Sequence, residues 1–440
     1  MVYFWQTLRA GPSILHVRIL YSILIYLLAP LVLIHLAYRG LRDGDYLKRW
    51  GERLALPASI KAAAAAPGGI VLHAVSVGEV NAAAPLIRAL LETRPQTTLT
   101  VTCFTPTGSN RLRELFSDEV QHLYLPLDLP GAVRRFFRTL QPDLLIIMET
   151  EIWPNLYARA AQLGLPVLIV NGRISNRSLP RYRRLKPFIA PALQKVAGIG
   201  AQSEVEAGRF CELGAPAGRV TVTGNLKFDL RLPDALRQQG SELRRSWGSD
   251  RPVVVAGSTH EGDEAALFTA FKGVLIHLSD ALMVLVPRHP ERFARVAEQA
   301  KTEGLSVHRL SDGPSVPSET QCLVVDAMGQ LLACYAAADL AFVGGSLENR
   351  GGHNVLEPAA LGIPVLMGPH THNFADISEG LVARGGARRA HDAIELESAM
   401  LEILQDAGLR RSMGAAALEQ VHAGQGALAR TLEIVTRATG

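Results

Sequence analysis

The sequence alternates short apolar runs with longer amphipathic stretches, and this alternation occurs twice along the chain. The runs cover residues 70–74, 99–104, 144–148, 167–170 and 220–223 in the first half, and residues 253–256, 283–286, 323–325, 340–343 and 365–367 in the second. Their β-branched residues and their glycine and proline borders favour strands over helices. Strands that alternate with helices form parallel, doubly wound sheets, because each return crossing needs a covering helix. The sequence therefore predicts an α/β fold with two Rossmann-like domains.

A polar, charged stretch over residues 231–251 separates the two series. The chain has 440 residues, of which 48% are hydrophobic, and this is enough for two domains of ordinary size. We expect a membrane anchor over residues 1–45, a first Rossmann-like domain over 46–235 and a second over 236–440. Ligands of such sheets bind beyond the carboxyl ends of the strands, so the motifs that follow strands are expected to line one cleft between the domains.

The expected anchor rests on an almost wholly apolar, uncharged run at residues 19–36, interrupted only by Pro30 and His35. That length is just sufficient to cross a bilayer. Two arginines precede the run and five basic residues follow it closely, which places the body of the protein in the cytoplasm. We expect a transmembrane helix with its N-terminus outside. An interfacial helix is the main alternative, and a cleaved signal peptide is disfavoured because no small-residue cleavage site follows.

Bulk composition excludes several other classes of protein. The net charge of +4 is too small to indicate nucleic-acid binding. No Asp-x-Asp element follows a strand, no zinc-type histidine pattern occurs, and no G-x-S-x-G elbow is present. The cysteines are far apart and show no metal-type spacing, so we predict no disulfide framework, no catalytic metal and no cofactor. They are Cys103, Cys211, Cys322 and Cys334.

Carboxylates follow two of the predicted strands in the first half. Glu79 closes the segment HAVSVGE near a helix start, where backbone dipoles are expected to keep it ionised. Such a group could take a proton from an attacking hydroxyl, as an inverting sugar transfer needs; a helix cap without chemistry is the alternative. Glu149 and Glu151, in ETEIWPN, would project to one side of an extended chain. Their sequence context supports a site and a solvent-facing role equally.

The densest basic segment of the chain begins in NGRISNRS and continues to Lys186. Its guanidinium groups could bind the phosphates of a lipid substrate or of the bilayer, whereas an ordinary solvated helix face is the alternative. Nucleic acid is disfavoured because no known binding fold accompanies the cluster. The candidate acceptor-binding residues are Arg173, Arg177, Arg181 and Arg184.

A single lysine, Lys227, lies in GNLKFD directly after the last predicted strand of the first half. An isolated lysine is usually a surface charge. Its position at the domain crossing makes it a candidate for stabilising a phosphate-bearing leaving group.

The second half contains glycine-rich or basic turns after successive strands: PRHPERF, DAMGQ, and GGSL leading to GGHNVLEP. Glycines let a backbone approach a ligand, and a helix expected to start near Asn354 would offer amides to an anion. Glu357 could accept hydrogen bonds from a ribose diol. Each turn alone is a weak signal, but together they predict a nucleotide site.

Taken together, these segments resemble the family of 3-deoxy-D-manno-octulosonic acid (Kdo) transferases. The resemblance runs from the anchor to about Phe374, with its blocks in family order: SVGEVNAAAPLI, ETEIWPN, NGRISNRS, GNLKFD, GSTHEGDE, PRHPERF, DAMGQL and GGHNVLEPAALGIPVLMGP. It implies the GT-B fold, a CMP-Kdo donor and an inverting transfer without a required metal. It also implies a lipid A disaccharide precursor (lipid IVA) as acceptor, at the cytoplasmic side of the inner membrane, in lipopolysaccharide biosynthesis.

The same resemblance assigns roles to individual residues. By similarity Glu79 is the proton acceptor, and Glu149 and Lys227 are transition-state stabilisers. Gln330 departs from the acidic residue expected after Met-Gly in many members. The CMP-binding residues implied are Pro287, Arg288, Met328, Gly329, Gln330, Asn354, Val355, Leu356 and Glu357. Two alternatives stay open: another GT-B enzyme with a different nucleotide sugar, and a non-catalytic membrane scaffold.

Overall fold

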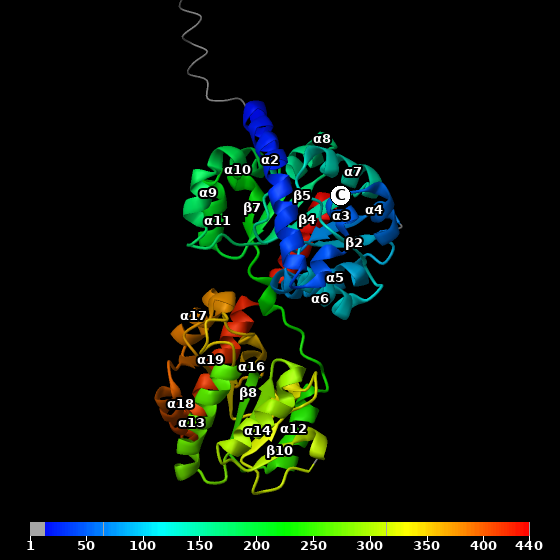
Figure 1. Ribbon diagram of the computed structural model, residues 1–440. Helices are drawn as coiled ribbons and strands as arrows, with labels where there is room; N and C mark the ends of the chain where they lie inside the picture. Colours follow the sequence, from blue (N-terminus) through cyan, green and yellow to red (C-terminus); the bar gives the residue numbers. More distant parts are fainter. Residues whose placement is uncertain (1–13, 65, 314, 440) are drawn as a thin grey trace, which may run out of the picture. The chain divides into compact units, whose positions relative to one another are not determined.

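A computed structural model describes residues 14–64, 66–313 and 315–439. The chain divides into two compact units (Figure 1). Unit 1 contains the described residues up to Asp229 together with those from Gln425 onward, and unit 2 is Leu230–Gly424. Each unit is built on one seven-stranded sheet in which every pairing is parallel. The predicted α/β class and its two Rossmann-like units are confirmed.

Unit 1 has the strand order β3-β2-β1-β4-β5-β6-β7. Its strands are β1 (Ile70–His73), β2 (Leu99–Cys103), β3 (Gln121–Tyr124), β4 (Leu144–Met148), β5 (Val167–Gly172), β6 (Gly198–Ala201) and β7 (Val220–Val222). Its helices are α2 (Ile14–Gly40), η1 (Gly44–Leu47), α3 (Trp50–Arg53), α4 (Pro57–Ala63), α5 (Val77–Thr93), α6 (Pro106–Phe116), α7 (Pro130–Leu140), α8 (Pro154–Gln162), α9 (Leu179–Arg184), α10 (Lys186–Leu193), α11 (Glu204–Glu212), η2 (Ala217–Arg219), η3 (Leu226–Phe228) and α20 (Ala427–Thr439).

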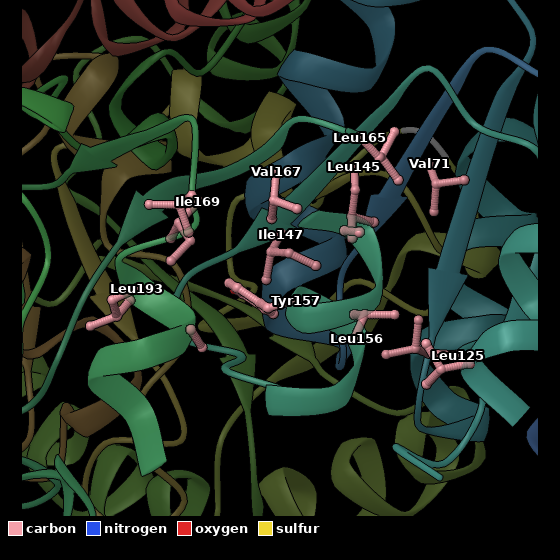
Figure 2. Close-up of a cluster of buried hydrophobic side chains, with 14 of the residues drawn as sticks. Val71, Leu125, Leu145, Ile147, Leu156, Tyr157, Leu165, Val167, Ile169 and Leu193 are labelled. Atoms are coloured by element: carbon pink, nitrogen blue, oxygen red, sulfur yellow. The ribbon is translucent and has the colours of Figure 1, made fainter. Parts of the chain in front are cut away.

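The central strands of unit 1 are apolar on both faces, because helices cover the sheet on both sides. Leu145 and Ile147 of β4 enter one core with Tyr157 of α8, as Figure 2 shows, whereas Ile146 and Met148 enter the core on the other face. Successive side chains of a strand point to opposite faces, so an uninterrupted apolar run is what a doubly covered strand requires.

Unit 2 has the strand order β10-β11-β9-β8-β12-β13-β14. Its strands are β8 (Val253–Thr259), β9 (Leu282–Pro287), β10 (Val307–Arg309), β11 (Cys322–Val324), β12 (Leu340–Val343), β13 (Val365–Met367) and β14 (Ala387–Arg389). Its helices are α12 (Leu236–Trp247), α13 (Glu261–His277), η4 (Pro290–Arg292), α14 (Phe293–Thr302), η5 (Leu310–Asp312), α15 (Leu331–Ala336), α16 (Leu356–Ala360), η6 (His372–Phe374), α17 (Ala375–Ala383), α18 (Ala393–Gln405) and α19 (Ala407–Gly424).

The last helix belongs to unit 1, which corrects the expected second domain of residues 236–440. The carboxylate of Asp229 accepts hydrogen bonds from the backbone N–H groups of Gly426 (2.7 Å) and Leu428 (2.6 Å), and so caps the first turn of α20. Ile434 and Val435 of α20 then enter the core that lies against α5. The chain therefore crosses between the units twice, once after Asp229 and once before Gln425.

Candidate functional site

In unit 1, the direction in which strands are added to the sheet reverses between β1 and β4. The chain goes from β1 outward to β2 and β3, and then returns to place β4 on the other side of β1. Loops that leave the carboxyl ends of two such strands diverge and leave a crevice, which is where open α/β sheets bind ligands. Glu79 follows β1 and Glu149 follows β4, so both lie beside this switch point.

Glu79 lies in the first turn of α5, which begins at Val77 with Ser76 as its N-cap. Its Oε2 accepts a hydrogen bond from the backbone N–H of Val75 at 2.9 Å. Burial, together with the neighbouring charge of Glu149, raises the pKa of Glu79 to about 8. The expectation that the helix dipole keeps this carboxyl ionised is therefore wrong at neutral pH. The dipole and one amide contribute less than desolvation and like charge do.

Glu149 has a left-handed backbone, with a φ of 53°. A non-glycine residue in this conformation costs about 1–2 kcal/mol. The backbone N–H of Glu149 donates to the carbonyl of Val170 at 2.9 Å, so the turn is attached to β5 at the point where β4 ends. Strain of this kind is often found where a side chain must be held in a functional position.

A pocket of about 260 Å³ collects the acidic groups of both loops. Glu151, which sequence reasoning left undecided, also lines it, and burial with the charge of Glu149 raises the pKa of Glu151 to about 7. Among the described residues none of these three carboxylates forms an ion pair. The lining residues are Glu79, Glu149, Thr150, Glu151, Arg173, Ile174, Ser175, Ser178 and Tyr182.

Of the four predicted acceptor-binding arginines, Arg173 lines this pocket. Thr150 donates a hydrogen bond to the carbonyl of Arg173, and Tyr182 donates to the carbonyl of Thr150 at 3.1 Å, so the loops after β4 and β5 hold each other. The other three arginines are exposed and are not among the lining residues; they are Arg177, Arg181 and Arg184.

Lys227 lies in η3, which packs against α5, but it is not among the residues that line the pocket. Its position depends on Asn171, a buried residue at the end of β5 whose φ is 55°. The side-chain oxygen of Asn171 accepts a hydrogen bond from the backbone N–H of Leu226 at 3.0 Å. Sequence reasoning did not select Asn171; the signal was a polar residue that continues an apolar strand, since such a residue needs a specific partner.

In unit 2 the corresponding reversal lies between β8 and β12. His260 follows β8 and His353 lies in the loops that follow β12, and their Nε2 atoms are 3.0 Å apart. Burial lowers the pKa of both imidazoles to about 4, so at neutral pH one uncharged ring donates to the other. Gly345 faces His353 with a φ of 68°, and a Cβ there would lie 2.9 Å from the His353 ring.

The predicted donor-binding residues follow β9 and β11. Pro287 is the last residue of β9, and the backbone N–H of Arg288 donates to the carbonyl of Thr259 at 3.1 Å. The Arg288 side chain is exposed. After β11, the segment Met328, Gly329 and Gln330 is exposed, and Gly329 has a φ of 81°. These residues are placed at the carboxyl ends of neighbouring strands of one sheet.

The remaining predicted donor residues surround the start of α16, which begins at Leu356, two residues after Asn354. The Asn354 side chain accepts from the backbone N–H of Leu356 and donates to Glu357, both at 3.1 Å. This amide therefore uses its oxygen and one of its two N–H donors within the protein. Val355 and Leu356 are both buried, with 1% of each residue exposed.

Two seven-stranded parallel sheets, each with its own switch point, define the GT-B class of fold. The solved UDP-GlcNAc 2-epimerase of Neisseria meningitidis is similar in fold, with a TM-score of 0.56 and 14% identity over 84% of this chain and 100% of that one. A solved glycosyltransferase of Rickettsia africae is similar with a TM-score of 0.55 and 15% identity, over 85% and 98% of the two chains. At these identities the likeness concerns the fold alone.

Sequence similarity is more specific than the fold. Residues 48–230 match the family model of 3-deoxy-D-manno-octulosonic-acid transferase (kdotransferase). The 3-deoxy-D-manno-octulosonic acid transferase of Haemophilus influenzae is 39% identical over 419 residues, which cover 95% of this chain and 98% of that protein. The chain belongs to the Kdo transferase family and is a glycosyltransferase.

Proposed function

We propose that this enzyme transfers Kdo from CMP-Kdo to the lipid A disaccharide precursor by direct displacement, with Glu79 as the base. The acceptor hydroxyl loses its proton to the Glu79 carboxylate and attacks the anomeric carbon of Kdo. A bond from the acceptor oxygen to that carbon forms while the bond to the phosphate oxygen breaks, and its electron pair leaves with CMP. One displacement inverts the anomeric carbon.

The observation that carries this proposal is the position and pKa of Glu79. The carboxyl follows β1 at the switch point and shares a pocket with Glu149 and Glu151. A general base works best when its pKa lies near the working pH, and burial raises the pKa of Glu79 to about 8. A carboxyl with an ordinary pKa would be a weaker proton acceptor.

We assign donor binding to unit 2. Arg288 supplies an exposed guanidinium that suits the CMP phosphate, with Pro287 beside it. Met328, Gly329 and Gln330 offer an exposed turn, and Glu357 offers a carboxylate to a ribose diol. Asn354, Val355 and Leu356 at the start of α16 complete the proposed set.

We assign the acceptor to unit 1. Arg173 lies in the pocket with Glu79, so it suits an acceptor phosphate or a charge near the reacting hydroxyl. Arg177, Arg181 and Arg184 are exposed and suit phosphates farther from that hydroxyl. Glu149 and Lys227 are proposed to stabilise the transition state, Glu149 through its charge beside Glu79.

A lipid acceptor also requires the enzyme to work at a membrane surface. One helix, Arg18–Gly40, is long and apolar enough to be a membrane-spanning candidate, with a mean hydropathy of 2.4. We propose attachment to the inner membrane through this helix, with both units on the cytoplasmic side. The basic residues that follow the apolar run favour that side.

The test is a transfer assay with the full chain in detergent, CMP-Kdo and a tetraacyl lipid A precursor, read by mass spectrometry. The expected product is heavier than the acceptor by one Kdo residue or by a whole number of them. Activity with UDP-N-acetylglucosamine in place of CMP-Kdo would contradict the donor assignment, and absence of any transfer would contradict the function.

A second arm of this assay addresses the donor site. Replacing the exposed Arg288 with alanine is expected to raise the KM for CMP-Kdo by about 10–100-fold, because a charge-assisted phosphate contact contributes roughly 1.5–3 kcal/mol. Arg295→Ala is the matched control, since Arg295 is an exposed arginine of unit 2 that pairs with Glu261. Equal KM values for the two variants would remove Arg288 from the site.

A further inference from the structure

The apolar helix α2 is docked on unit 1 at its N-terminal end. The Tyr21 hydroxyl donates to the carboxylate of Asp128 at 3.0 Å, and the Ser22 hydroxyl donates to the side-chain oxygen of Asn155 at 3.0 Å. Asp128 is buried and also accepts from the backbone N–H groups of Asn155 and Leu156, at 2.9 and 2.8 Å, where α8 begins. The helix is thus bonded to an internal part of the folded unit.

The C-terminal end of the same helix is docked as well. Leu36 and Gly40 are buried, and a Cβ on Gly40 would lie 2.4 Å from the Leu47 side chain of η1. The Arg39 guanidinium lies 4.2 Å from the ring centre of Tyr46, also in η1. Unit 1 therefore holds α2 at both ends, and Figure 1 shows the helix (blue) lying along this unit, in contact with α8 and α10.

Docking divides the helix surface into two stripes. The inner stripe is partly or fully buried and comprises Tyr21, Ser22, Ile25, Ala29, Leu33, Leu36, Ala37 and Gly40. The outer stripe is apolar and between 48% and 69% exposed, and comprises Leu20, Ile23, Leu24, Leu27, Leu31, Ile34 and Tyr38. Both follow the spacing of one helical face. An outer apolar stripe of this length needs a partner, because isolated folded proteins rarely expose so large a continuous apolar patch.

A helix in this arrangement cannot cross a bilayer unless unit 1 enters the bilayer with it. A span of 23 residues is about 35 Å long, close to the ~30 Å of the hydrocarbon layer. The ends of a spanning helix lie on opposite sides of that layer, whereas one unit contacts both ends of α2.

We propose that α2 lies in the plane of the membrane, with its inner stripe on unit 1 and its outer stripe embedded in one phospholipid leaflet. Basic side chains flank the stripe at both ends, where they meet anionic headgroups. Arg18 and Lys195 line a small pocket between α2 and α10, and Arg39 and Arg42 lie at the other end. Tyr26 and Tyr38 add amphipathic rings that suit the interface.

This inference rests on the membrane attachment proposed above, not on Kdo transfer, and it changes the topology. A spanning helix puts the N-terminus and the folded units on opposite sides of the membrane. A helix in the membrane plane puts them on the same side, and the interfacial alternative left open by the sequence then applies.

The first test compares two otherwise unchanged full chains in spheroplasts, one with an epitope at the N-terminus and one with an epitope at the C-terminus. Both epitopes are expected to resist externally added protease and to be digested only after lysis. Digestion of the N-terminal epitope in intact spheroplasts, with the C-terminal one protected, would overturn the proposal and leave the membrane attachment intact.

The second test measures flotation of the full chain with phosphatidylethanolamine–phosphatidylglycerol vesicles. Leu24→Glu with Leu27→Glu in the outer stripe is expected to reduce the vesicle-bound fraction at least tenfold. Ile276→Glu is the matched control, because Ile276 is 80% exposed but lies in unit 2, and its flotation is expected to be unchanged. A wild-type chain that does not float but sediments as a dimer would show that a second copy covers the stripe, which would overturn the proposal.

Docking itself is tested by disulfide formation in native membranes, in a Cys211→Ser background. Ser22→Cys with Asn155→Cys is expected to cross-link, because the replaced side-chain atoms are 3.0 Å apart. Leu27→Cys with Asn155→Cys is the control and is expected to stay reduced, since Leu27 is 69% exposed on the outer stripe. Absence of the first cross-link in a variant that retains transfer activity would contradict docking.

Discussion

The two units place carboxylates at the same edge of the same kind of sheet, yet they treat them differently. In unit 1, Glu79, Glu149 and Glu151 share one pocket, and the pKa values of Glu79 and Glu151 are raised to about 8 and 7. In unit 2, Glu264 forms a two-pronged ion pair with Arg292, at 2.9 and 2.5 Å, and Asp326 pairs with Arg309 at 2.6 Å.

This contrast distinguishes carboxylates that can exchange protons from carboxylates that hold a loop in place. A carboxylate beside other carboxylates can gain or lose a proton near neutral pH, which suits a base. A carboxylate bound to arginine or to backbone amides holds its neighbours in place. Asp263 is an example of the second kind, since it accepts from the backbone N–H groups of His260, Gly345 and Leu347 and so fixes the glycine-rich loop.

The largest expected effect is a loss of turnover when the proposed base, Glu79, is replaced. Glu79→Gln is expected to reduce kcat by about 10²–10⁴-fold, the usual contribution of a general base, while the thermal midpoint at neutral pH stays within a few degrees of wild type. Steady-state transfer assays and calorimetry measure the two quantities. Glu119→Gln, an exposed glutamate of the same unit, is the control and should retain full activity. Near-normal turnover of folded Glu79→Gln would remove the base assignment.

In unit 2, by contrast, we expect the loss of a carboxylate to reduce stability rather than turnover. Glu264 is 0% exposed, so Glu264→Ala leaves the Arg292 charge without its partner and is expected to lower the free energy of unfolding by about 3–5 kcal/mol. Chemical denaturation measures this loss. Adding Arg292→Ala should recover part of the stability, because the unpaired charge is then removed. A Glu264→Ala protein of normal stability but low kcat would instead place Glu264 in the chemistry.

The pH dependence of kcat tests whether Glu79 is the base and whether Glu149 affects its pKa. A base must be ionised, so kcat is expected to rise with pH through about 8, the raised pKa of Glu79. Glu149→Gln removes a neighbouring negative charge, which should move this rise to lower pH even though the maximal rate falls. Lys227→Met serves as a comparison that removes the other proposed stabiliser. A rise that stays at the same pH in Glu149→Gln would show that the two carboxyls do not interact.

The smallest expected effect concerns stability rather than rate. The folded-state pKa of Glu79 lies above its unfolded value of 4.5, so its contribution to stability is full below pH 4.5 and is lost as pH rises through about 8. Glu79→Gln cannot ionise, so its thermal midpoint relative to wild type should be higher at pH 9 than at pH 5, by a few degrees. If the thermal midpoints of Glu79→Gln and wild type differed by the same amount at pH 5 and pH 9, burial would not disfavour the charged Glu79 carboxylate.

Much of the fold could be read from the sequence because parallel strands buried on both faces require continuous apolar runs. All ten predicted strands are present, from the one at Ile70–His73 to the one at Val365–Met367. Four described strands were not predicted: β3, β6, β10 and β14. β6 reads Gly-Ile-Gly-Ala, and the other three begin or end in polar residues, so no apolar run marks them.

The candidate site was only partly predictable. Glu79 and Glu149 were candidates because both follow strands, and the family resemblance assigned their roles; their common pocket follows from the strand order. Asn171, which holds η3 and hence the backbone of Lys227, could not be selected, because its partner lies 55 residues further along the chain. The arginines around α9 could be recognised as a basic group, but their sequence positions do not separate Arg173 in the pocket from its exposed neighbours.

The sequence by itself determined the class of fold, the strands that carry the site and the family, because each depends on local patterns or ordered motifs. The tertiary structure alone decided three further features: the protonation of Glu79, the return of α20 to unit 1, and the docking of α2. Each depends on groups far apart in sequence, namely Glu149 for Glu79, Asp229 for α20, and Asp128 with Asn155 for α2. Desolvation and long-range hydrogen bonds act through space, so composition and spacing along the chain do not specify them.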